Sequence, residues 1–122
     1  MSHVVTIEAE ARDPAAVAAA CRRLGLPAPV MGTAKLFEGE ATGLLVRLSG
    51  WLYPAVVEAA TGKVRYDNYG GAWGDPAQLG RFLQGYALEK AALEARKGGH
   101  AVTERALADG SIRLTVTVGG GA

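Results

Sequence analysis

The strongest constraint on the fold of this chain is an Asp-Pro-Ala triplet that occurs twice, at 13–15 and at 75–77. An aspartate in this position can accept hydrogen bonds from the free backbone amides at the start of a helix. Proline fits the first helical position because the backbone N–H that it lacks would have no partner within the helix there. Apolar residues at spacings of three and four follow both triplets, and Gly25 and Gly98 stand where such helices should end. The sequence therefore predicts two helices, the second running from Pro76 to about Lys97.

Between and around these helices, apolar and polar residues alternate with the period of two that is typical of strands. The last such run is the clearest, because Ile112, Leu114 and Val116 alternate with polar side chains after an Asp109-Gly110 turn signal. Pro54 interrupts one run, which favours an edge position for that strand. The predicted extended segments are 3–11, 35–38, 43–48, 51–60, 64–69, 102–107 and 112–118.

Seven strands and two helices in the order strand, helix, four strands, helix, two strands predict an α+β fold. We expect a single antiparallel sheet of about seven strands with both helices on one face. Residues 1–118 should form a single α+β domain, and 119–122 a flexible Gly-rich tail. The predicted core consists of Val5, Ile7, Val17, Cys21, Leu44, Val46, Leu79, Phe82, Leu83, Tyr86, Ile112, Leu114 and Val116.

The overall charge of the chain disfavours nucleic acid as a partner. Thirteen basic and twelve acidic side chains leave a formal charge of +1, so no strong field attracts the protein to phosphates or to anionic membranes. The single cysteine excludes an intramolecular disulfide, and the chain contains no run of membrane-spanning length. We therefore expect a soluble protein in the cytoplasm with no membrane association.

The segment from Tyr66 to Asp75 combines three large aromatic rings with three glycines. Such a combination fits either a packed corner or a binding site, and we favour packing, with Trp73 filling a corner between the sheet and the second helix. The alternative is a contact surface in which the aromatic residues act beside a polar sheet face of Glu8, Glu10, Arg47, Arg113 and Thr115. The candidate ligand- or partner-binding residues are Asp67, Asn68, Tyr69, Trp73, Arg47 and Arg113.

No pattern in the chain indicates catalytic residues, a metal site or a cofactor. The two histidines do not have metal-ligand spacing, and no phosphate-binding glycine motif is present. Cys21 lies on the predicted buried side of the first helix, and a buried thiol makes a poor nucleophile. Lys90 falls within the apolar stripe of the second helix, where we expect its amine to extend to water.

Several motifs together resemble domain-of-unknown-function family twelve fifty-seven, which includes the hypothetical chloroplast reading frame thirty-five. The motifs are Met-Ser-His at the start, Arg12-Asp13, 66–74, Gln84-x-Tyr86-Ala87-x-Glu89, 94–97 and 109–112, and the closest likeness is to planctomycete members. The resemblance spans nearly the whole chain. It implies no activity and no catalytic residue, because the family has none assigned.

These observations favour a non-catalytic binding or accessory domain that acts through protein–protein contacts, with a protein partner of unknown identity. An edge strand could also pair two copies of the chain. The alternative is a small-ligand-binding domain or a small enzyme, with a pocket near the Tyr66–Asp75 segment. Such a pocket would use Asp67, Asn68 and Tyr69 together with Lys90 or His100.

Overall fold

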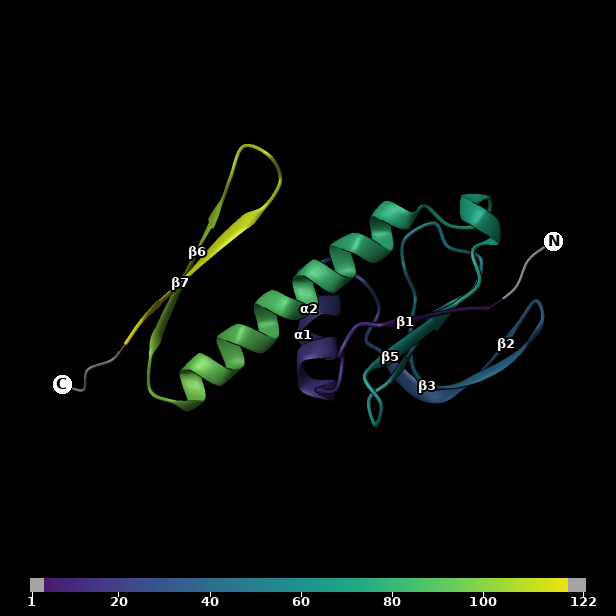
Figure 1. The fold of residues 1–122 in the computed structure, drawn as a ribbon, viewed down its shortest axis with the longest axis horizontal. Helices are drawn as coiled ribbons and strands as arrows, with labels where there is room; N and C mark the ends of the chain where they lie inside the picture. The colour runs from purple at the N-terminus through teal and green to yellow at the C-terminus, as the bar shows by residue number, and fades with distance from the viewer. Residues whose placement is uncertain (1–3, 119–122) are drawn as a thin grey trace.

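The computed structural model describes residues 4–118, in which two helices and seven strands form an α+β fold. Figure 1 shows the long helix α2 running across the molecule, with a five-stranded sheet near one end and a separate hairpin near the other. The elements are β1 (Val5–Glu8), α1 (Pro14–Arg23), β2 (Val30–Leu36), β3 (Gly39–Val46), β4 (Ala55–Glu58), β5 (Lys63–Tyr66), the short 3₁₀ helix η1 (Tyr69–Gly71), α2 (Pro76–Lys97), β6 (Ala101–Ala106) and β7 (Ile112–Thr117).

Both helices begin where the Asp-Pro-Ala triplets predict. The Asp13 carboxylate accepts from the amides of Ala15 and Ala16, and Asp75 accepts from the amide of Ala77. The predicted α+β class, the seven strands and their antiparallel pairing are confirmed. The predicted Gly-rich tail at 119–122 lies outside the described residues.

The strands divide into two sheets, where the sequence predicted one. The larger sheet has the order β1-β5-β4-β3-β2, and β6 pairs only with β7. The division follows from the length of α2, because a helix of 22 residues spans about 33 Å and carries the chain beyond the sheet before β6 begins. Pro54 directly precedes β4, which is an inner strand, so the predicted edge position was wrong; the proline stays outside the ladder and removes no donor from it.

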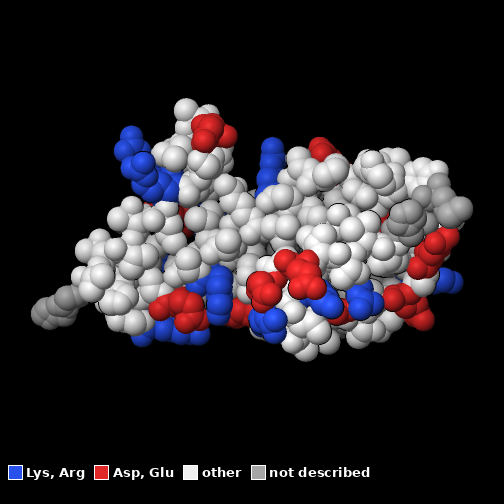
Figure 2. All heavy atoms as spheres, viewed as in Figure 1, with Lys and Arg blue, Asp and Glu red and all other residues white. Residues whose placement is uncertain are grey.

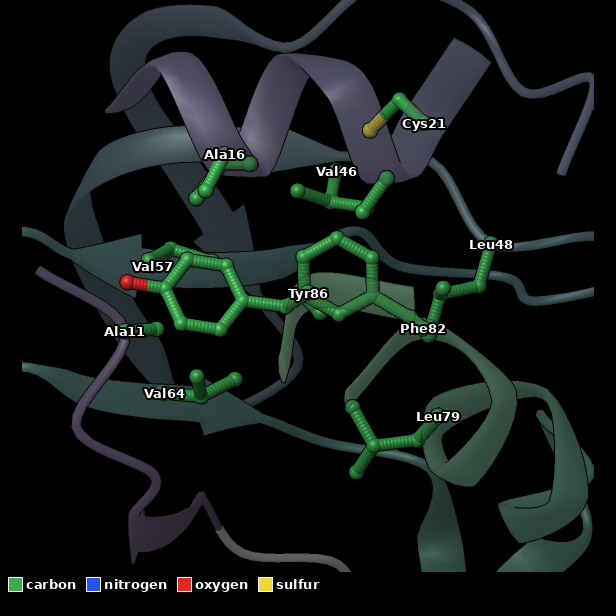
Figure 3. Close-up of a cluster of buried hydrophobic side chains, with 13 residues drawn as sticks. Ala11, Ala16, Cys21, Val46, Leu48, Val57, Val64, Leu79, Phe82 and Tyr86 are labelled. Atoms are coloured by element: carbon green, nitrogen blue, oxygen red, sulfur yellow. The ribbon is translucent and has the colours of Figure 1, made fainter. Parts of the chain in front are cut away.

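The main core lies between the helices and one face of the larger sheet. In Figure 3 the side chains of Phe82 and Tyr86 on α2 meet Ala16 of α1 and Val57 of β4. Gly85 of α2 is buried beside Ala20 of α1. A Cβ at this position would lie 3.4 Å from Cδ of Arg23 and 3.6 Å from Cβ of Ala20, so an alanine would fit between the two helices.

The predicted core residues fall into three groups. Val17, Cys21, Val46, Leu79, Phe82 and Tyr86 are buried. Half-buried are Val5, Ile7, Leu44, Leu83, Ile112 and Leu114. Val116 is 42% exposed and is not a core residue, because β7 lies in the separate hairpin.

A second, smaller cluster lies on the sheet face turned away from the helices. Val56 and Val57 are adjacent on β4, so their side chains point to opposite faces of the sheet. The Val56 side chain packs with Leu36 and Ala41 of the β2–β3 hairpin. Tyr53 lies against this cluster. The opposite face is therefore partly covered, and its border carries the aromatic residues described next.

Candidate functional site

Four aromatic side chains, Phe37, Tyr53, Tyr69 and Trp73, meet at the border of the second cluster, and we call them the aromatic patch. Tyr69 stacks on Trp73 with ring centroids 4.7 Å apart and planes at 21°. The ring of Phe37 lies 5.3 Å from that of Trp73, and the ring of Tyr53 lies 5.8 Å from it. Trp73 is therefore the centre of the patch.

The patch is assembled from segments far apart in the chain. Phe37 lies in the turn between β2 and β3, and Tyr53 lies in the loop before β4. The backbone amide of Leu52 donates to the carbonyl of Trp73 at 2.9 Å, which joins the loop before β4 to the segment before α2. Only this tertiary arrangement brings Phe37 beside Trp73, and the sequence contained no signal for it.

A large part of the patch faces solvent. The exposed fraction is 58% for Phe37 and 43% for Tyr69, and the neighbouring Leu52 is 59% exposed. Aromatic pairs of this geometry contribute about 0.5–1.5 kcal/mol beyond area burial, so the rings hold one another in place without being covered. The result is a preorganised apolar surface.

The backbone at Tyr69 adopts a conformation that non-glycine residues rarely take. Its φ is 49°, in the left-handed region, where an L-residue costs about 1–2 kcal/mol. The amide of Tyr69 donates to Oδ1 of Asp67 at 3.4 Å, and the following Gly70 and Gly71 also have positive φ. This strained turn directs the Tyr69 ring onto Trp73.

Asp67 and Asn68 support the turn from inside the protein. The side-chain amide of Asn68 donates to the carbonyl of Gly74 at 3.1 Å, and the backbone carbonyl of Asn68 accepts from the amide of Trp73 at 2.9 Å. Asp67 is only 1% exposed, and its Oδ2 has no hydrogen-bond partner among the described residues. A buried carboxyl oxygen without a partner costs stability, which marks this position as unusual.

The structure brings together four of the six predicted site residues. Asp67, Asn68, Tyr69 and Trp73 are neighbours in one turn, as their sequence positions require. Arg47 is an exposed residue that directly follows β3, and Arg113 lies on β7 in the other sheet. The predicted polar face that combined Glu8 with Arg113 therefore does not exist, since β1 and β7 belong to different sheets.

The corner between the sheet and α2 is filled by Trp51, whereas the sequence predicted Trp73 there. The Trp51 ring packs on the main core, with its centroid 5.6 Å from that of Tyr66. Its indole N–H donates to the carbonyl of Asp75 at 3.0 Å, next to the start of α2. Trp73 instead packs against Phe37, Tyr53 and Tyr69 in the aromatic patch. Periodicity could not separate the two tryptophans, because both lie in loops.

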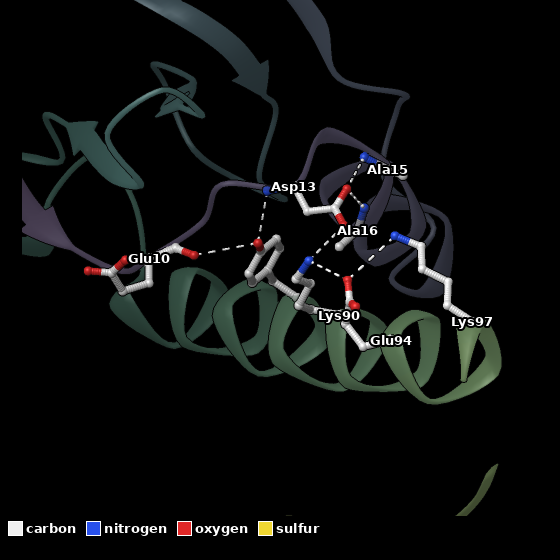
Figure 4. Close-up of polar contacts among 8 residues, drawn as sticks. Glu10, Asp13, Ala15, Ala16, Lys90, Glu94 and Lys97 are labelled. Atoms are coloured by element: carbon white, nitrogen blue, oxygen red, sulfur yellow. Dashed lines mark hydrogen bonds and ion pairs between the residues drawn. The ribbon is translucent and has the colours of Figure 1, made fainter. Parts of the chain in front are cut away.

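Lys90 reaches the molecular surface, as predicted, with its side chain 39% exposed, and two carboxylates hold its amine there. Its Nζ lies 2.7 Å from Oε1 of Glu94 and 3.1 Å from Oδ2 of Asp13, as Figure 4 shows. The hydrogen bonds that the ammonium donates to Glu94 and then to Asp13 raise the pKa of Lys90 above its usual range. An ammonium held in this way is a poor base and a poor nucleophile.

A surface hollow of about 440 Å³ lies beside Lys90, lined in part by Ala9, Leu83 and Ala91. Its lining contains no residue of the Tyr66–Asp75 segment. Lys90 is in the second half of α2, whereas Asp67 and Tyr69 precede the start of that helix. The hollow beside Lys90 is therefore separate from the Tyr66–Asp75 segment.

The cysteine and the side chains that could bind a metal ion can be judged within residues 4–118. Cys21 is fully buried, and this burial raises the pKa of its thiol. Among residues 4–118, no three His, Cys, Asp or Glu side chains come together in a way that could hold a metal ion. Within the same range, no helix is long and apolar enough to cross a membrane.

The fold and the surface define an α+β domain that presents an exposed, preorganised group of aromatic side chains. Comparison of the chain with protein-family models, with curated proteins and with solved structures gave no match. The resemblance to the chloroplast reading-frame family stays a prediction.

Proposed function

We propose that this protein is a non-catalytic binding domain whose aromatic patch docks onto an apolar segment of a partner protein. The observation that carries the proposal is the convergence of three rings on Trp73 while Phe37 and Tyr69 remain 58% and 43% exposed. Aromatic residues supply much of the binding energy at protein interfaces, because they cover large areas and lose little side-chain freedom.

The strained turn at Tyr69 supports a role in binding over one in folding. A tyrosine in the left-handed backbone conformation is less stable than a glycine at the same place, and the Tyr69 ring stacks on Trp73 while remaining 43% exposed. Such a cost is typical of residues that are preorganised for a contact. Asp67 and Asn68 act here as positioning residues for the turn.

Affinity copurification from the native host tests the proposal with a matched pair of variants. Phe37→Ser with Tyr69→Ser removes the exposed rings, and Val30→Ser with Met31→Ser removes exposed apolar side chains from β2 as the control. We expect one protein to copurify with the wild type and the control and to be lost from the patch variant. Equal recovery on the patch variant would contradict the proposal, provided that circular dichroism shows both variants folded.

A small polar ligand is the second candidate function, and the unpartnered Oδ2 of buried Asp67 is the observation that favours it. Mass spectrometry of small molecules in the same preparations separates the two candidates. A metabolite retained by the patch variant but lost from Asp67→Asn would support ligand binding over protein docking.

Pairing of two copies through an edge strand is a separate prediction about assembly. The edges of the larger sheet are β1 and β2, and β2 is the longer, with seven residues. Sedimentation of the purified protein over a range of concentrations checks this prediction. A single monomeric species throughout would contradict it.

A further inference from the structure

The β6–β7 hairpin has one face anchored to the helices. Glu104 of β6 accepts from Arg23 of α1 in a forked pair, with distances of 2.8 and 2.6 Å. Leu114 of β7 lies directly opposite Glu104, and Ile112 lies opposite Ala106, so both side chains share the face of the hairpin that carries Glu104. Both are half-buried. The orientation of the hairpin is thereby defined.

The other face of the hairpin carries two arginines directly opposite each other. Arg105 of β6 pairs in register with Arg113 of β7, so their side chains share one face. This face points away from the helices, because the neighbouring Glu104 and Leu114 point toward them. Both arginines are exposed, and basic side chains project outward in Figure 2 where Figure 1 places the hairpin.

This arrangement is unfavourable for the isolated protein. Like charges directly opposite each other destabilise a strand pair, and a hairpin of two strands is only marginally stable by itself. Neither Arg105 nor Arg113 forms an ion pair with any residue in the described range. The nearest carboxylate in sequence, Glu104, is already occupied by Arg23 on the opposite face.

The neighbouring cross-strand pair extends the face with hydroxyl groups. Thr103 lies opposite Thr115, and both side chains are exposed on the same side as the arginines. Backbones of paired strands lie about 5 Å apart, so two guanidinium groups there can reach one carboxylate between them. The threonine hydroxyls can donate to the next acceptor along the strands.

We propose that this arginine face, formed by Thr103, Arg105, Arg113 and Thr115, binds an acidic polypeptide segment. The surface is distinct from the aromatic patch and does not depend on it. An acidic peptide fits better than a nucleic acid, because the face carries only two cations and the whole chain has a formal charge of +1. Nucleic-acid affinity grows with the number of phosphates neutralised, and two contacts contribute little.

The test measures fluorescence anisotropy of a labelled peptide of alternating glutamate and threonine, titrated with the full chain. Arg105→Gln with Arg113→Gln should weaken binding at least about tenfold, since each arginine supplies charge-assisted hydrogen bonds. The control variant, Lys35→Gln with Arg47→Gln, changes the net charge equally at exposed sites in and next to strands of the other sheet. It should stay within about twofold of the wild type, because exposed charges at a distance are screened.

Three outcomes of the binding assay would overturn the proposal. The first is no binding of the acidic peptide, the second is an equal loss in the control variant, and the third is tighter binding of labelled single-stranded DNA than of the peptide.

A thermal scan adds a measurement that would change if the arginines had a purely structural role. Arg113→Gln should leave the unfolding midpoint unchanged or raise it, because it removes a like-charge pair. A lower midpoint would show that the arginines stabilise the hairpin and would count against the proposal.

Discussion

The corner that Trp51 fills offers a sharp test of packing through Gly74→Ala. A Cβ at position 74 would lie 2.4 Å from Cδ2 of the Trp51 ring and 2.6 Å from Cε2. These are ring-fusion atoms of a side chain packed on the core, so the indole has to move as a whole. The movement also removes the hydrogen bond from the indole N–H to Asp75. Overpacking of this kind costs about 2 kcal/mol.

A double-mutant cycle isolates the cause. Trp51→Ala alone should cost about 3 kcal/mol, at the lower end for a tryptophan because the ring is half-buried. In the Trp51→Ala background, Gly74→Ala should cost almost nothing, since the clashing ring is absent. The coupling energy between the two positions is therefore about 2 kcal/mol.

Urea unfolding followed by circular dichroism measures each free energy of unfolding without relying on tryptophan fluorescence. Gly80→Ala is the control, because its Cβ would meet no atom within 4 Å on an exposed part of α2. It should stabilise the protein by about 0.5–1 kcal/mol, as expected for helix propensity. An equal cost of Gly74→Ala with and without Trp51 would refute the packing argument.

Two further predictions concern the ionisable groups of the core and the helix contacts. Cys21 should resist alkylation by iodoacetamide in the folded protein and react promptly in denaturant, because burial raises the pKa of its thiol; rapid labelling of the native state would contradict this. Hydrogen bonds from Lys90 and from Arg23 lower the folded-state pKa of Asp13 and of Glu104 respectively. The two ionised carboxylates therefore stabilise the folded protein fully above the pKa of an ordinary carboxyl group, about 4. This stabilisation is lost as the pH falls through their lowered folded-state pKa values. Asp13→Asn with Glu104→Gln should flatten the fall in unfolding midpoint between neutral pH and pH 3, and an unchanged slope would count against it.

The helices and the strand pairing could be predicted from the sequence because their determinants are local. Asp13 and Asp75 satisfy amides two or three residues ahead, so each helix start is specified within a single turn. Apolar alternation in β7 and the Asp109-Gly110 turn likewise predict the last hairpin from adjacent residues. Cys21 was correctly assigned to the core for the same reason, since helical spacing defines one apolar side.

Tertiary structure alone decided which tryptophan fills the corner, which group holds Lys90 and how the strands divide. Trp51 and Trp73 both lie in loops without periodicity, and their positions depend on segments that meet only after folding. Lys90 binds Asp13 from 77 residues away, an approach that requires α1 to pack on α2. The aromatic patch depends on the same kind of contact, because Phe37 reaches Trp73 only through the β2–β3 hairpin. Local sequence patterns reflect interactions between neighbouring residues, whereas the aromatic patch arises from contacts between residues far apart in the chain.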